Sequence, residues 1–130
     1  MLAFDFGLRH IGVATGQTIT RTATPLTTLR ARDGVPDFDE IRALIDEWKP
    51  GQLIVGLPLN MDDTDNHITT RARRFARRLE GRFGLPVALT DERLTSRAAA
   101  EALEAPHTDQ RTHSYAAMLI ASTWLENAPQ

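Results

Sequence analysis

The first third of the chain has the hydrophobic pattern of β-strands. Residues 2–7 form a short apolar run that ends in glycine and contains one carboxylate, Asp5. A second run over residues 11–19 is rich in β-branched side chains, and residues 22–29 alternate threonine with apolar residues. Because β-branched residues favour strands and the connections are short, these segments predict three strands of an antiparallel meander.

The period then changes to that of an α-helix. Asp37 followed by Glu40 resembles a capping box, and apolar side chains recur every three or four positions up to Trp48. Pro50 and Gly51 follow, and we expect them to end this helix.

The rest of the chain alternates strands and helices. The pattern predicts a strand buried on both faces, a helix, a last strand and two further helices, over residues 53–57, 68–82, 87–90, 95–105 and 114–125. Strands joined through a helical crossover are parallel. The sequence therefore predicts an α/β fold, a mixed sheet with helices on both faces, and we expect residues 1–130 to form a single domain.

Composition excludes several classes of function. The chain has no cysteine, which rules out disulfides, zinc–thiolate sites and thiol nucleophiles. Seventeen acidic and fifteen basic residues give a net charge of −2, so the chain as a whole is not a basic nucleic-acid-binding protein. No apolar run approaches the ~20 residues of a membrane span. The amino terminus lacks the pattern of a secretory signal. We therefore expect a cytoplasmic protein with no membrane partner.

The basic residues are unevenly distributed. Fourteen of the fifteen are arginine, and six of these fall in one predicted helix. Arg71, Arg74 and Arg78 recur along one flank of that helix beside its apolar stripe, so we expect them to face water with only Glu80 nearby to neutralise them. Arginine binds phosphates through paired hydrogen bonds. The row predicts contact with nucleic acid, and the alternative is a solvated face with some ion pairs.

Carboxylates gather where the predicted strands end. Asp5 lies near the end of the first strand, Glu92 follows the last one, and Asp62, Asp63 and Asp65 lie in the loop after the fourth. Ligands of open α/β sheets bind outside the carboxyl ends of parallel strands. Converging carboxylates with no thiolate favour Mg²⁺ or Mn²⁺, and two such ions about 4 Å apart can activate water and stabilise a leaving oxygen. The alternatives are that Asp5 caps a turn and that the loop aspartates bond their own backbone.

Three segments resemble the motifs of the YqgF family. They are DFGLRHIGVA from Asp5, IVGLPLNMD from Ile54 and DERLTS from Asp91. Members of this family have an RNase H fold, are similar to Holliday-junction resolvases and include pre-16S rRNA nucleases. The resemblance covers essentially the whole chain and implies a five-stranded sheet in the order 3-2-1-4-5.

The resemblance also implies an activity. It implies a metal-dependent nuclease, using Mg²⁺ or Mn²⁺, that processes the 5′ end of precursor 16S rRNA in ribosome biogenesis. A resolvase acting on branched DNA and a non-catalytic nucleic-acid-binding module are the alternatives. A monomer and a homodimer both remain open, and a stable monomer would favour the RNA substrate because cutting two strands needs two sites.

The resemblance assigns roles to particular residues. The family's first acid falls on Asp5 and its glutamate on Glu92, and these two would hold the metal. Its third acid, an aspartate at the start of the last helix, falls on His113, which departs from the family. Imidazole suits manganese better than magnesium. Alternatively, His113 moves a proton, Asp91 or Asp109 supplies the missing oxygens, or the site is inactive.

The sequence also gives expectations for two further arginines, both tryptophans and one more histidine. Arg9 and Arg93 lie close in sequence to the predicted catalytic acids, so we expect them to bind the scissile phosphate. Trp48 and Trp124 lie on apolar helical stripes, so we expect them in the core. We interpret His10, in the turn after Asp5, as structural.

Overall fold

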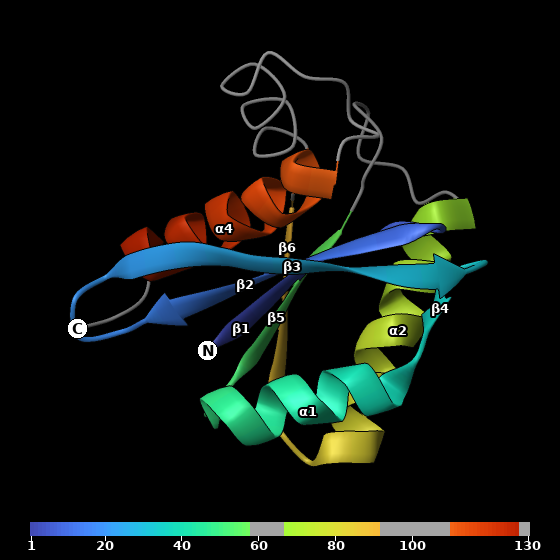
Figure 1. Ribbon diagram of the computed structural model, residues 1–130, viewed down its shortest axis with the longest axis horizontal. Coiled ribbons are helices and arrows are strands. Elements are labelled where there is room, and N and C mark those ends of the chain that lie inside the picture. Colours follow the sequence, from blue (N-terminus) through green and yellow to red (C-terminus); the bar gives the residue numbers. More distant parts are fainter. Residues whose placement is uncertain (58–66, 92–109, 128–130) are drawn as a thin grey trace.

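The computed structural model describes residues 1–57, 67–91 and 110–127. Within these ranges one six-stranded sheet is covered by helices on both faces, with α4 on one face and α1 and α2 on the other (Figure 1). The elements are β1 (Leu2–Asp5), β2 (His10–Gln17), β3 (Thr22–Arg32), β4 (Val35–Pro36), α1 (Phe38–Trp48), β5 (Leu53–Leu57), α2 (His67–Phe83), β6 (Val87–Asp91) and α4 (Gln110–Asn127).

The strand order is β4-β3-β2-β1-β5-β6. Strands β1 to β4 pair antiparallel in succession, whereas β5 pairs parallel with both β1 and β6. This confirms the predicted α/β fold and the predicted order of the five main strands. The additional strand, β4, has two residues and follows a tight turn at Asp33 and Gly34, both of which have positive φ, 54° and 84°.

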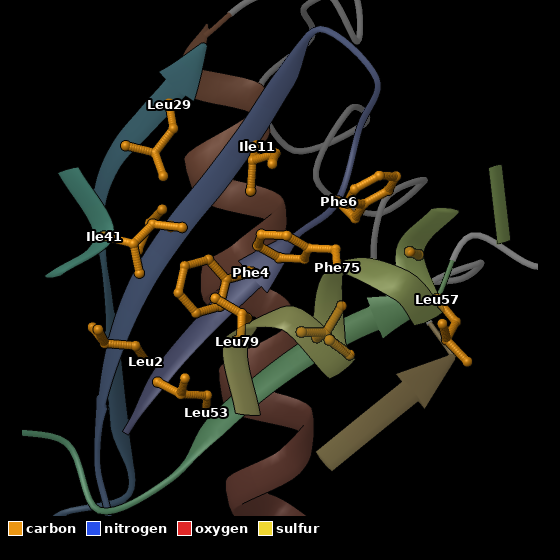
Figure 2. Close-up of a cluster of buried hydrophobic side chains, with 14 residues drawn as sticks. Leu2, Phe4, Phe6, Ile11, Leu29, Ile41, Leu53, Leu57, Phe75 and Leu79 are labelled. Carbon is orange, nitrogen blue, oxygen red and sulfur yellow. The ribbon is translucent and has the colours of Figure 1, made fainter. Parts of the chain in front are cut away.

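Large apolar side chains fill the space between the sheet and helices α1 and α2 (Figure 2). Phe75 of α2 lies at the centre of this core, with its ring 5.7 Å from that of Phe4 and 5.5 Å from that of Phe6. Leu2 and Phe4 point to this side because alternate residues of a strand face opposite sides of the sheet. Ala3 and Asp5 therefore face α4.

The α4 side of the sheet is built from small residues. On β2, Gly12, Ala14 and Gly16 face α4, while Ile11 and Val13 face the other core. We call Gly12, Ala14 and Gly16 the small-residue face of β2. The buried side chains of α4 are also mostly alanine, which lets the helix approach the sheet closely: Ala116, Ala117, Ile120, Ala121 and Leu125. The contact is tight enough that a Cβ added to Gly12 would lie only 2.9 Å from the amide nitrogen of Ser114.

The first helix begins and ends where the sequence predicts, but one of its side chains lies elsewhere than expected. Asp37 is the N-cap, and its side chain accepts a hydrogen bond from the backbone N–H of Asp39 at 2.9 Å. The helix ends just before Pro50, as predicted, and its C-cap Lys49 adopts the left-handed conformation with φ 46°. The expectation that Trp48 lies in the core is wrong, because it sits in this last turn and is 38% exposed. Trp124 does pack against the core on the α4 side.

The helix predicted over residues 95–105 lies outside the described residues, as do the loop acids Asp62, Asp63 and Asp65. None of the helices in the described ranges is long and apolar enough to cross a membrane.

Candidate functional site

Asp5 occupies the last position of the central strand β1. It is 8% exposed and is the only buried charged residue among those that the structure describes. Aspartate is rarely buried unless its charge is compensated, because removing a carboxylate from water is costly. A buried carboxylate at the carboxyl end of a central strand is therefore the strongest indication of a functional site in the described part of the chain.

His113 lies beside this strand end, in the first part of α4. Asp5 pairs with Gly12 across the antiparallel β1–β2 ladder, and the backbone of His113 lies directly against Gly12. The imidazole of His113 also stacks on that of His10, with ring centroids 5.2 Å apart and ring planes 22° from parallel. Its Nε2 atom is buried. The fold thus brings residue 113 to the neighbourhood of Asp5, where the family resemblance predicted the third acid.

The other predicted metal ligand lies just beyond the described residues. β5 separates β1 from β6, and the registers place Asp5 level with Gly56 and Gly56 level with Thr90. The last residue of β6 is Asp91, so these parallel strands end at the same edge of the sheet. Glu92 is the next residue in the chain and falls outside the described residues, as does Asp109.

The described residues contain no group of three or more acidic, histidine or cysteine side chains that could hold a metal ion. Asp5 offers the oxygen donors that hard cations require, and an imidazole such as that of His113 can serve as a manganese ligand or accept a proton. The donor set therefore fits a divalent cation in part.

The arginine row lies on a different layer of the molecule. α2 packs on the face of the sheet opposite to α4 (Figure 1). Because Asp5 faces α4, the sheet lies between its side chain and the arginine row. Arg74 and Arg78 are exposed, as expected. Arg71 instead contacts Asp33 in the β3–β4 turn, donating from Nη1 to the carboxylate at 2.6 Å and to the backbone carbonyl at 2.8 Å. Glu80 is therefore not the only acid that neutralises the row.

The structure describes one of the two arginines that were predicted to bind the scissile phosphate. Arg9 is exposed in the bend between β1 and β2, and its carbonyl oxygen accepts a hydrogen bond from the N–H of Ala31 at 2.8 Å. This places Arg9 at the edge of the sheet where β1 ends. Arg93 lies outside the described residues.

Sequence reasoning missed two features around this site. It treated His10 as a structural residue of the turn, whereas the ring of His10 is the stacking partner of His113. It also attached no role to Gly12. The alternation of a strand could have found both features, because one face of β2 carries His10 followed only by small residues, namely Gly12, Ala14 and Gly16. Such a face is typical of close packing by a helix.

Comparison with known proteins gives consistent results. A family model described as Holliday junction resolvase, RuvX, matches residues 1–127. A protein of Sodalis glossinidius named "Putative pre-16S rRNA nuclease" is 47% identical, with 100% of this chain and 96% of the relative covered. A protein of Nitrosococcus oceani with the same name is 51% identical, with 96% of this chain and 85% of the relative covered.

Among solved structures, Thermus thermophilus RuvC in complex with a Holliday junction substrate has a similar fold. The TM-score is 0.59, and the match covers 95% of this chain and 91% of that chain. The sequence identity is 15%, so this likeness concerns the fold alone.

Proposed function

Because this chain belongs to the RuvX family of Holliday junction resolvases, we propose that it is a nuclease that hydrolyses phosphodiester bonds in precursor 16S rRNA during ribosome maturation. The relatives that resemble it over nearly their full length carry the name pre-16S rRNA nuclease. The observation that carries the proposal is the buried Asp5 at the carboxyl end of β1. We further propose that residues 1–130 act as one domain, in the cytoplasm.

In this proposal Asp5 and Glu92 hold a divalent cation, Mn²⁺ or Mg²⁺. The fit rests on the buried oxygen donors of Asp5 and on the common edge at which β1, β5 and β6 end. When bound, such a cation lowers the pKa of a coordinated water and neutralises charge on the phosphate. If His113 is a ligand it favours manganese over magnesium, since manganese accepts nitrogen ligands more readily.

The protein's own residues have distinct tasks. The stack on His10 and the contact with Gly12 hold His113 beside Asp5, where its imidazole can ligate the cation or exchange a proton with the substrate. Arg9 and Arg93 bind the phosphate next to the bond that breaks, because a guanidinium matches two phosphate oxygens at once. Arg71, Arg74 and Arg78 bind more distant phosphates of a folded RNA. Arg71 must first exchange its contact with Asp33 for one with the RNA.

The experiment is cleavage of a precursor 16S rRNA fragment by the purified protein in the presence of Mn²⁺. The Asp5→Asn variant should lose cleavage, whereas Asp46→Asn, which makes the same change on an exposed carboxylate of α1, should cleave like the wild type. Equal cleavage by both variants would exclude Asp5 from the site. Binding of RNA without any cleavage would favour the non-catalytic module.

A second candidate substrate is a four-way DNA junction. The RuvC structure with a similar fold is a complex with a Holliday junction substrate, and this observation favours the DNA alternative. The same protein should therefore be assayed in parallel on junction DNA and on precursor rRNA. A resolvase must cut two strands and needs two sites, so a homodimer that cleaves the junction faster would favour the DNA substrate, and a monomer that cleaves the RNA would favour rRNA.

A further inference from the structure

We propose that Arg30 and Arg32, on the outer strand β3, bind the phosphate backbone of the nucleic acid where it passes beside the Asp5 site. This inference rests on the proposed function, because it names a surface on which that substrate lies. Neither residue belongs to the arginine row of α2, and neither lies close in sequence to the predicted acids. We call Arg30 and Arg32 the β3 arginine pair.

The pairing of β2 with β3 determines which way Arg30 faces. His10 faces α4, since its ring stacks on that of His113. Arg30 lies directly opposite His10 in the antiparallel ladder. Directly opposed residues project from the same face of a sheet. Arg30 therefore stands on the α4 face, next to the two stacked histidines.

Arg32 shares this face. Leu29 is buried in the core on the opposite side of the sheet, and Ala31 packs against that core. Because residues alternate along a strand, Arg30 and Arg32 point the other way, toward the α4 side. Both are exposed. Their Cα atoms are about 7 Å apart, a spacing close to that of neighbouring phosphates along one nucleic acid strand.

The β3 arginine pair and Asp5 lie at the same end of the sheet. Asp5 is level with Gly12 on β2, and Gly12 is level with Thr28 on β3. Arg30 is two residues after Thr28 on the same face of β3, so it lies closer than Thr28 to the edge where the parallel strands end. A backbone whose scissile phosphate lies at Asp5 reaches Arg30 by crossing the width of two strands, on the order of 10 Å.

The charges favour an anionic partner. Arg30 and Arg32 place two exposed positive charges on one face of β3, the face on which Asp5 lies. Arginine also provides the planar, two-pronged donor that phosphate oxygens accept.

The position of the arginine row of α2 strengthens this assignment. α2 covers the other face of the sheet, where Phe75 packs on Phe4. A substrate on Asp5 has to pass around the end of the sheet before it meets Arg74 or Arg78, whereas the β3 arginine pair lies on the same face as Asp5. The β3 arginine pair should therefore contribute more than Arg74 and Arg78 to contacts on the face that carries Asp5.

The test compares two double variants by RNA binding without metal, in EDTA, so that no cleavage occurs. The first is Arg30→Gln with Arg32→Gln. The control is Arg21→Gln with Arg77→Gln, which removes the same charge from exposed positions, one in the β2–β3 connection at the other end of the strands and one on α2. The probe is the precursor 16S rRNA fragment, and affinity is measured at several salt concentrations.

The β3 double variant should bind roughly tenfold more weakly at 0.1 M salt, and the slope of log affinity against log salt should fall by about two units, one for each lost phosphate contact. The control should change the slope by much less. Equal effects of the two double variants would overturn the proposal, because they would show a response to overall charge alone. A slope that is unchanged in the β3 variant, both with this fragment and with four-way junction DNA, would also overturn it.

Failure of this inference and failure of the proposed function give different results. A wild-type protein that binds the RNA fragment and never cleaves it contradicts the proposed nuclease, but the β3 pair is still tested by binding. Running both double variants on four-way junction DNA tells which nucleic acid the pair prefers. A β3 effect with either probe supports the phosphate contact, and no effect with both contradicts it.

Discussion

Replacing Gly12 by alanine tests whether the contact between β2 and α4 positions the site. A Cβ on Gly12 would lie 2.9 Å from the amide nitrogen of Ser114 and closer still to the carbonyl group of His113, whereas real Cβ atoms essentially never approach within 3.0 Å. These neighbours are backbone atoms of a helix, so they cannot rotate away as a side chain can. The start of α4 must retreat by about 1 Å, because close-packed interiors transmit such strain.

Two magnitudes follow from this displacement. Overpacking of this kind lowers the free energy of unfolding by about 1–3 kcal/mol. A misplacement of about 1 Å at a reacting group lowers the rate of cleavage by about 10²-fold. We therefore expect Gly12→Ala to fold with reduced stability and to lose most of its activity on RNA.

The assay measures both quantities on the same preparation, stability by urea unfolding and activity by cleavage of precursor rRNA. The matched control is Gly81→Ala in α2, where an added Cβ meets nothing within 4 Å. That change should raise the free energy of unfolding by roughly 0.5–1 kcal/mol, because alanine loses less entropy than glycine in a helix. A Gly12→Ala protein with wild-type stability and wild-type cleavage would refute the reasoning.

Three further predictions can be measured with standard assays. His113→Asp should strengthen Mg²⁺ binding, measured by calorimetry, and raise the rate of cleavage with magnesium, whereas His113→Asn should do neither. If His113→Asp binds magnesium no more tightly than the wild type, position 113 is not a ligand. Replacing Arg74 and Arg78 by alanine should weaken RNA binding and flatten its salt dependence by roughly one unit per lost phosphate contact with little loss of stability, whereas an unchanged slope identifies a solvated face. Phe75→Ala should lower the free energy of unfolding by about 3–5 kcal/mol, because its buried ring packs on Phe4, and a loss below ~1 kcal/mol would contradict that packing.

The sequence predicted the fold well because periodicity reports burial directly. The apolar run at residues 53–57 is buried throughout, as a central parallel strand requires. The amphipathic pattern that contains Phe75 predicted α2 to within a residue at each end. The residues predicted the meander and the parallel crossover, and the family resemblance implied the full order of the five main strands.

Local details were beyond the sequence because they depend on tertiary contacts. The periodic stripe of α1 placed Trp48 in the core, but the helix ends beside it and leaves it exposed. The contact of Arg71 with Asp33 joins residues 38 positions apart, which no local pattern connects. The stack of His10 on His113 likewise exists only once α4 lies on β2.

The small-residue face of β2 has a consequence for the order in which the protein becomes active. Asp5 and His113 are more than a hundred residues apart, so a ribosome synthesises the carboxylate early and the histidine after all six described strands. In the proposed site, the docking of α4 onto Gly12, Ala14 and Gly16 is what brings His113 to Asp5. Under the proposed assignment of the site, a nascent chain surrounded by ribosomal RNA therefore lacks a complete site until α4 has docked, which delays cleavage until folding is nearly done.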